Sequence, residues 1–301
     1  MTGAAITDPT APLTASGNLR RRAAVSRVAE VGATASALLA VAVLGLLVYT
    51  VAKRGGTAIS LDFLTKDPPL FGGPGGGIAP SIIGTGIIVG AATVITAPLG
   101  ILIAIYLTEV AGPRPARVIR MALDLMNGLP TIVVGVFVFG LLVAERHESG
   151  FAGSIALAII MLPLISRASQ EVLLLVPSSL REAADALGVS RSRSILTIVL
   201  PAALGGIVTG TILAVARAAG ETAPLIVVSS LFAPTVSTDF FGHGGLGLPN
   251  IPVTIFQLSE QADASSFSRA WGAAFVLLAF ILLANIFARL LLARSRPKLG
   301  R

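Results

Sequence analysis

Six apolar stretches without a charged residue run along the chain, and shorter polar segments separate them. They cover residues 31–52, 81–108, 125–144, 149–166, 194–216 and 270–288. A helix needs about 20 mostly apolar residues to cross the hydrocarbon core of a bilayer. The pattern therefore predicts an all-α polytopic membrane protein with six transmembrane helices.

Two further segments do not fit a simple transmembrane helix. The charge-free stretch 222–238 contains Pro224 and Pro234, and proline interrupts helices. We interpret this stretch as the end of the fifth transmembrane helix followed by a turn, and a re-entrant segment is the alternative. The segment 68–77 is so rich in glycine and proline that it cannot hold a regular helix. Its composition favours a flexible linker over an ordered loop that packs against a partner.

The composition supports a membrane-embedded protein and argues against an ordinary soluble enzyme. Hydrophobic residues make up 54% of the chain and charged residues 12%, whereas soluble proteins carry about 25% charged residues. The chain has no cysteine and two histidines, so it can form neither a disulfide nor a thiolate metal site. We expect this chain to bind no metal and no cofactor.

The positions of the basic residues predict the orientation of the chain in the membrane. If both termini are cytoplasmic, the outer segments hold five of the 22 basic residues, and Arg217 lies within a span. The remaining sixteen then lie on the inner side, as the positive-inside rule requires. Contact with anionic membrane lipid accounts for the net charge of +7, so no nucleic-acid partner is needed.

These patterns divide the chain into four parts. Residues 1–28 are rich in alanine, threonine and proline and end near three consecutive arginines, which is typical of a disordered basic cytoplasmic tail. The others are the first transmembrane helix with a Gly/Pro-rich outer loop (29–80), a transmembrane core with a cytoplasmic loop (81–293, loop 176–201), and a basic cytoplasmic C-terminus (294–301).

The cytoplasmic loop 176–201 carries the signals of a short helix. Ser179 and Glu182 have the spacing of a capping box, and Gly188 is placed as a helix-ending glycine. A helix over 180–187 would bring Leu180, Ala184 and Leu187 to one face. Such a helix is either an incidental turn or a knob that docks into the groove of a partner protein. Pro201 is expected as an early residue of the fifth transmembrane helix.

Two motifs in this half of the chain resemble a known family. Glu182-Ala183-Ala184, Gly188, Ile198 and Leu200-Pro201 match the EAA loop of bacterial ABC importer permeases at every position. The stretch 216–225, which reads ARAAGETAPL, resembles the PstA family of phosphate importer permeases. Tyr106–Glu109 and the segment 128–135, GLPTIVVG, are similar to the same family.

The resemblance implies a type I ABC importer permease fold in a bacterial inner membrane, with both termini cytoplasmic. It implies a PstC-like second permease, a PstB-like ATPase dimer that binds ATP and Mg²⁺, and a PstS-like protein that delivers inorganic phosphate. The helix with the EAA motif would couple the ATPase to the spans. The candidate coupling residues are Arg181, Glu182, Ala183, Ala184, Asp185, Gly188 and Pro201. In agreement, the chain contains no phosphate-binding loop of its own.

Arg217 and Glu221 are the candidate residues of the substrate pathway. An ionisable residue within a span is costly and indicates function, and the two lie at i and i+4, on one face of a helix. The guanidinium of Arg217 matches the geometry of phosphate oxygens, and Glu221 would limit tight binding. The alternative is a structural ion pair. Thr222 is a weaker candidate donor to phosphate, and Glu109 is interpreted as an interfacial residue at a helix end.

Three other functions compete with phosphate import. The first is a permease of the same fold for another oxyanion, sulfate or molybdate, because its pathway would use similar chemistry. The second is a channel or ion-driven transporter that acts alone, which would need no docking helix. The third, a membrane-embedded enzyme, lacks support because the acidic residues are scattered singly.

Overall fold

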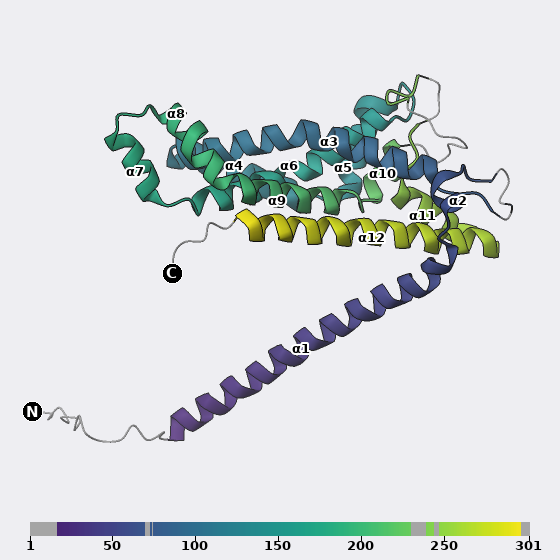
Figure 1. Ribbon diagram of the computed structural model, residues 1–301, viewed down its shortest axis with the longest axis horizontal. Coiled ribbons are helices and arrows are strands. Elements are labelled where there is room, and N and C mark those ends of the chain that lie inside the picture. Colours follow the sequence, from purple (N-terminus) through teal and green to yellow (C-terminus); the bar gives the residue numbers. More distant parts are fainter. Residues whose placement is uncertain (1–16, 70–72, 74, 230–238, 244–246, 296–301) are drawn as a thin grey trace, which may run out of the picture. The chain divides into compact units, whose positions relative to one another are not determined.

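The structure is a computed structural model that describes residues 17–69, 73, 75–229, 239–243 and 247–295. Within these residues it is all helical and contains no strand (Figure 1). The chain divides into two units, Met1–Thr50 and Val51–Arg301. Among the described residues, five helices are long and apolar enough to cross a membrane, or six if the bent pair of α4 and α5 forms one span. The expected all-α architecture is therefore confirmed.

The first unit holds most of a single long helix, α1 (Gly17–Gly55). The helix includes residues 17–28, so the expectation of a disordered tail up to residue 28 is wrong there. No glycine or proline lies between Asn18 and Val31, and leucine, arginine and alanine in this stretch favour a helix. Residues 1–16 lie outside the described residues.

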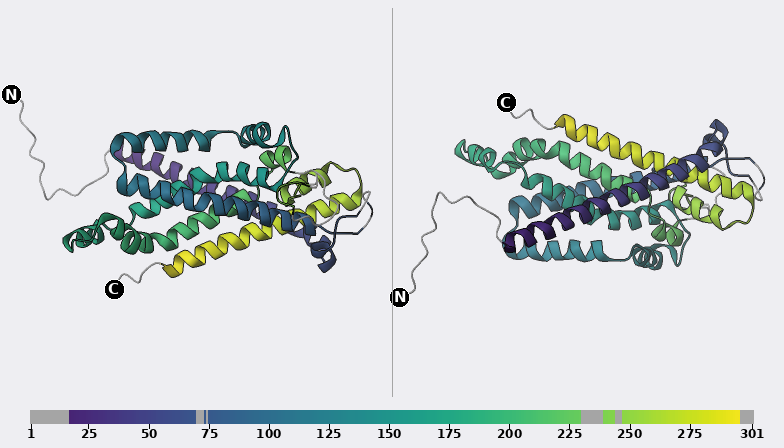
Figure 2. Two further views of the ribbon diagram at one scale, coloured as in Figure 1. Left: turned by 90° about the horizontal axis from the view of Figure 1, so that it is seen from above. Right: turned by 90° about the horizontal axis from the view of Figure 1, so that it is seen from below.

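In the second unit, long helices run lengthwise (Figures 1 and 2). These are α3 (Ala79–Ile105), α6 (Gly150–Leu174), α9 (Leu200–Ala218) and α12 (Ala264–Ser295). The contacts of α6 are chiefly with α3 and α9. The main core cluster joins α3, α6 and α9 through Ile88, Leu157, Met161, Ile165 and Ala214, among others. Shorter helices complete the unit: α2 (Leu61–Thr65), α4 (Pro113–Gly128), α5 (Thr131–Val138), α7 (Ser178–Ala186), α8 (Arg191–Ser194), α10 (Ala223–Val228) and α11 (Ile251–Glu260).

The expected third transmembrane helix, over residues 125–144, is wrong as a continuous helix. The chain breaks between α4 and α5, which meet at an angle of 95°. Leu129 and Pro130 have extended backbone at the break. Proline disfavours the helical conformation in the residue before it, so the Leu129-Pro130 pair separates the two helices. After α5 the chain continues as a π-helical turn, η4 (Phe139–Val143).

Helices α6 and α12 are longer than their charge-free stretches. Helix α6 continues past Ser166 to Leu174 and includes Arg167, which pairs with Asp124 of α4. The last helix includes Arg269, whose Nη2 donates to Ser266 Oγ at 2.8 Å. A charge within a membrane protein is tolerated where a polar partner is at hand. The length of a charge-free stretch therefore underestimates the length of these helices.

The segment between α1 and α3 is ordered where it is described, so a flexible linker is wrong for these residues. Phe63 of α2 is buried in a cluster with Ile78, Ile251 and Ala273. The backbone N–H of Ile78 donates to Phe63 O at 2.8 Å, and that of Gly77 donates to Asp67 O at 3.0 Å. Residues 70–72 and 74 lie outside the described residues.

The start of α12 is fixed by a cap that lies outside the span. Asp263 accepts hydrogen bonds from the Ser265 hydroxyl at 2.6 Å and from the backbone N–H of Ser266 at 2.7 Å. These donors, the hydroxyl first, hold the pKa of Asp263 well below its ordinary value. Its carboxylate is therefore ionised throughout the physiological range and suits a helix N-terminus.

We expect Phe63→Ala to lower the free energy of unfolding of the purified chain by about 3 kcal/mol, because it removes a fully buried aromatic side chain. Thermal unfolding in detergent measures the change. Leu61→Ala in the same short helix removes an exposed side chain and serves as the control. Equal effects of the two substitutions would contradict an ordered, packed loop.

Candidate functional site: the α7 loop and the break between α9 and α10

The predicted helix after α6 is present as α7, and its end matches the prediction. Gly188 has a left-handed backbone with φ of +69°. Its N–H donates to Asp185 O, and the N–H of Val189 donates to Ala184 O, each at 3.0 Å. This pair of bonds is a Schellman motif, which requires the left-handed residue that glycine supplies most readily. The role of Gly188 as the helix-ending residue is confirmed.

The predicted start of α7 is wrong. The helix begins at Ser178 with Pro177 as its N-cap, and no side chain caps its first turn. Ser179 therefore lies inside the helix, and its spacing from Glu182 does not form a capping box. The fixed φ of proline suits the residue that leads into a helix.

Leu180, Ala184 and Leu187 were expected to share one face of α7, but they do not have the same environment. Ala184 is buried, whereas Leu180 and Leu187 are exposed, Leu187 by 82%. Glu182, Ala183 and Asp185 are also exposed. We call these exposed residues, Leu180, Glu182, Ala183, Asp185 and Leu187, the exposed face of α7. It combines apolar and acidic side chains and is available to a partner.

Arg181 points away from the exposed face and into the protein. Its Nη2 donates to Glu109 Oε1 at 2.8 Å and its Nε donates to the same oxygen at 3.2 Å. It also donates to two carbonyls at the end of α6, Leu173 O at 3.0 Å and Val176 O at 2.7 Å. Arg181 thus positions α7 from within.

Glu109 lies in a π-helical turn, η3 (Tyr106–Val110), that extends α3. Its side chain is only 8% exposed, so it is more enclosed than the expected interfacial residue. The sequence pattern does not pair Glu109 with Arg181, because 72 residues separate them. The available signal was that Glu109 directly follows the second predicted span and Arg181 lies in the predicted cytoplasmic loop, on the same side of the membrane.

Pro201 is the second residue of α9, as expected, but the span begins before α9. The helix runs without interruption from Arg191 through the π-helical turn η5 (Ile195–Val199) into α9, 28 residues in all. Proline has no N–H to donate to the preceding turn, and π-helical turns relieve such gaps in a helix. Along a straight helix, Arg217 is therefore about 39 Å from the start of the span at Arg191, whereas it is only about 24 Å from Pro201.

The break after Arg217 separates the two candidate pathway residues. Helix α9 ends at Ala218, so Arg217 and Glu221 do not share a helix face as expected. Their side chains still approach, with Arg217 Nε 3.8 Å from Glu221 Oε1. The Arg217 side chain is 62% exposed and that of Glu221 16%. Thr222 Oγ1 donates to Gly220 O at 3.4 Å, a local bond of the kind expected for threonine.

The stretch after Glu221 forms its own short helix, α10, rather than the end of the fifth span. Helix α10 packs against α5 (Figure 1). A Cβ atom added to Gly135 of α5 would lie 2.7 Å from the Cα of Pro224, so the close approach requires glycine. The two breaks, before α5 and before α10, thus lie in neighbouring segments. Residues 230–238 of the predicted turn lie outside the described residues.

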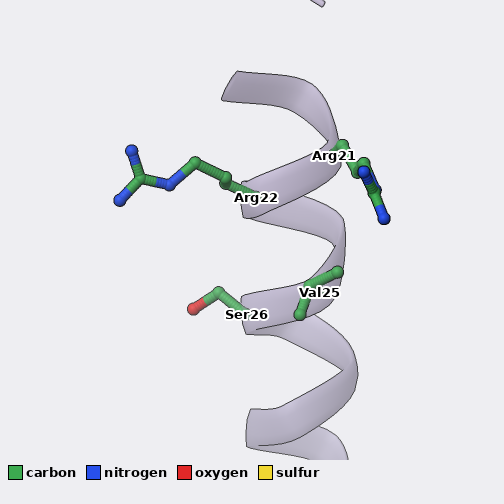
Figure 3. Close-up of a pocket in the computed structure, with 4 residues that line it drawn as sticks. All are labelled: Arg21, Arg22, Val25 and Ser26. Atoms are coloured by element: carbon green, nitrogen blue, oxygen red, sulfur yellow. The ribbon is translucent and has the colours of Figure 1, made fainter. Parts of the chain in front are cut away.

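This arrangement can offer an anion one flexible cation beside a less exposed carboxylate. Arginine donates up to five N–H groups in a planar fork that suits phosphate oxygens. No group of three histidine or acidic residues among the described residues could hold a metal ion. A hollow on α1 is lined by Arg21, Arg22, Val25 and Ser26 (Figure 3). These come from neighbouring turns of one helix, so this hollow has no opposing wall and is not a substrate site.

Comparison with known proteins agrees with the fold. The family described as "Binding-protein-dependent transport system inner membrane component" matches residues 96–297. A crystal structure of a bacterial alginate ABC transporter, in complex with an alginate pentasaccharide-bound periplasmic protein, covers 90% of this chain and 96% of its own at a TM-score of 0.55 and 15% identity. The fold is therefore that of an ABC importer permease.

Curated relatives narrow the family. The phosphate transport system permease protein PstA of Yersinia pestis is 40% identical over 273 residues, which is 90% of this chain and 91% of that protein. PstA of Haemophilus influenzae is 38% identical over 247 residues, 81% of this chain and 85% of that protein. The chain belongs to the inner membrane components of binding-protein-dependent transport systems, and within them to the PstA permeases.

We expect Gly188→Leu to reduce substrate-stimulated ATPase activity in the assembled transporter by about threefold or more, because a left-handed leucine costs about 1–2 kcal/mol and tilts the end of α7. No atom lies within 4 Å of a Cβ at Gly188, so backbone conformation, not space, causes the effect. Gly188→Asn, which tolerates this conformation, is the control and should retain most of the stimulation. Full stimulation in Gly188→Leu would contradict the role of this turn.

Proposed function

We propose that this chain is a transmembrane permease subunit of an ATP-driven importer of inorganic phosphate. The main support for this proposal is the chain's 40% identity to a phosphate transport system permease over 91% of that protein's length. The described helices supply the apolar spans such a subunit needs. The chain is a transport subunit and not an enzyme, and it works in a bacterial inner membrane.

Phosphate passes beside Arg217, at the break between α9 and α10. A dianion that leaves water needs donors that replace its hydration, and the exposed guanidinium of Arg217 supplies them. The Glu221 carboxylate, 3.8 Å from Arg217 Nε, competes with phosphate for the same cation. This competition keeps binding weak enough for release. Thr222 can turn its hydroxyl from Gly220 to the anion.

Interrupted helices support a phosphate pathway at the break between α9 and α10. Discontinuous spans line the substrate sites of many transporters, because backbone groups freed at a break must be buried in protein or line a cavity. Here the chain breaks before α5 and before α10, and the two segments pack on each other at Gly135 and Pro224. Alternating access would open this region to one side of the membrane at a time.

The exposed face of α7 couples the spans to a PstB-like ATPase dimer. Leu187 and Ala183 supply the apolar contact of a docking knob, and Glu182 and Asp185 supply charge at its rim. Arg181, Ala184, Gly188 and Pro201 act indirectly, because they hold the loop in shape. ATP and Mg²⁺ bind to the ATPase and not to this chain.

Two more partners complete the transporter. A PstC-like second permease would face the exposed side of Arg217, and a PstS-like protein would deliver phosphate to the outer side. The excess of basic residues in the α3–α4, α6–α9 and terminal segments favours cytoplasmic placement of α7 and of both termini.

Uptake of labelled phosphate tests the substrate. We expect deletion of the chain to abolish high-affinity phosphate uptake in its host, and its restoration to rescue it, while sulfate and molybdate uptake stay unchanged. If sulfate or molybdate uptake is lost instead, that anion is the substrate, and the assignment of the fold is unaffected. Unchanged uptake of all three anions, in cells with no second phosphate system, would contradict the proposal. Uptake without the ATPase would favour a transporter that acts alone.

We expect Arg217→Gln and Arg217→Lys to reduce phosphate uptake by about tenfold or more, because a bidentate charge-assisted hydrogen bond contributes about 1.5–3 kcal/mol. Uptake is measured in complexes shown by co-purification to be assembled. Arg146→Gln changes an exposed arginine outside the described long helices and is the control. Near-normal uptake in Arg217→Gln would favour a structural ion pair.

A further inference from the structure

Besides packing against η5 through the buried side of α7 that includes Ala184, helix α7 joins the long helices of the second unit in two ways. The chain itself links α7 to α6 through the short segment 175–177, and to α9 through α8 and η5. The second link is the side chain of Arg181. Among the ion pairs of the described residues, the pair of Arg181 and Glu109 is the one that joins α7 to another helix.

The guanidinium of Arg181 lies where three elements meet. It contacts Glu109 of η3, the carbonyl of Leu173 in the last turn of α6, and the carbonyl of Val176 just after α6. All three of its nitrogens donate, and because the guanidinium is planar, these bonds together fix its position and orientation. A lysine or a glutamine could not make these contacts together.

Glu109 is enclosed on the other side of this pair. Its carboxylate is buried and lies at the end of α3, where the π-helical turn η3 adds one residue to the turn. An added residue rotates the side chains that follow it, and such turns are frequent at functional sites. A buried carboxylate that lost its partner would be strongly disfavoured, so α3 and α7 are held together.

Helix α3 is in turn packed closely on α6. Ser154 Oγ of α6 donates to Ile88 O of α3 at 3.1 Å. A Cβ atom at Gly100 would lie 2.9 Å from Ile165, and Ala104 and Leu173 share a second cluster near the α7 end. Contacts thus run from Ile88 to Ala104, over about 24 Å of helix, which makes α3 and α6 one stiff pair.

We propose that Glu109 and Arg181 form a coupling latch that transmits displacement of α7 to α3 as well as to α6. Without the latch, α7 pivots about the segment 175–177, and part of its displacement is not transmitted to the spans. Arg181 and Glu109 are positioning residues and contact neither phosphate nor nucleotide. The inference rests on the proposed function, because it takes α7 as the helix that the ATPase moves.

The test uses the full transporter reconstituted in liposomes with its ATPase and binding protein. Four forms are compared: the unaltered chain, Glu109→Gln, Arg181→Gln and the double variant. We expect basal ATPase activity to stay within about twofold, while phosphate-stimulated activity and phosphate moved per ATP fall by about fivefold or more in each single variant. The double variant should be no worse than the more affected single variant, because both break one interaction.

Two substitutions control for loss of charge. Arg193→Gln and Glu171→Gln remove exposed charges from α8 and α6 and should keep full stimulation.

Arg181→Lys retains the charge but not the planar fork, so we expect partial loss of stimulation. If stimulation in the single variants stays within twofold, or if their effects multiply in the double variant, the latch is wrong. Lower thermal stability with unchanged phosphate moved per ATP would also overturn it, since that outcome shows a merely structural pair.

A spectroscopic measurement does not depend on the transported anion. The chain has no cysteine, so spin labels can be placed at Val110→Cys in η3 and Ser179→Cys in α7, both exposed positions. Electron paramagnetic resonance then measures the distance between labels with and without ATP on the bound ATPase. We expect one narrow distribution in the unaltered chain and a broader one in Glu109→Gln; identical distributions would overturn the latch.

Failure of the latch and failure of the proposed function give different results. If phosphate does not stimulate the unaltered transporter, the assignment of phosphate is wrong, and the label distances still decide whether Glu109 holds α7 to α3. If phosphate stimulates the unaltered transporter and Glu109→Gln equally, the function stands and the latch is wrong.

Discussion

The close packing around α6 is the constraint on which the rest of the second unit depends. A bilayer offers helices little hydrophobic driving force for association, so they rely on close van der Waals contact and shared hydrogen bonds. Small residues on α6 and its neighbours allow this: Gly206 and Gly210 of α9 approach Val172 and Ala168. Ser154 supplies a hydrogen bond to the backbone of α3. Everything that the chain does at α7 or at Arg217 is positioned by helices that pack on α6.

Departures from regular helix lie where the candidate chemistry lies. The extended Leu129-Pro130 pair precedes α5, and the turn at Gly220 precedes α10. The π-helical turns η3 and η5 flank the α7 loop. A regular helix satisfies its own backbone and exposes only side chains, whereas a break or π-helical turn redirects side chains and releases backbone groups. Helices α3 and α6 run unbroken past one internal proline each, Pro98 and Pro163, while the π-helical turns and breaks lie at helix ends and in the pathway region.

Charged residues inside this fold have three different environments. Glu109 is enclosed with Arg181, Arg167 pairs with Asp124 between two helices, and Arg217 remains largely exposed beside Glu221. Arg181 donates through all three of its nitrogens within the chain, and Arg167 is paired with Asp124 although its buried Nε has no partner among the described residues, so both pairs suit structural and positioning roles. Arg217 retains free donors within the described residues. That difference, more than the presence of charge, separates a candidate substrate contact from a positioning pair.

The sequence by itself determined the all-helical class with its apolar spans, the type of protein and the turn at Gly188. These follow from local properties: the length of apolar runs, motif spacing, and the left-handed backbone that glycine adopts without strain. It did not predict the 95° break before α5, the inward direction of Arg181, or the end of α9 at Ala218. The direction of Arg181 depends on residues far apart in the chain, whereas the break before α5 lies at the local Leu129-Pro130 pair. Only the tertiary structure brings Glu109 to Arg181 and Gly135 to Pro224, because burial and pairing depend on what lies across a helix interface rather than along the sequence.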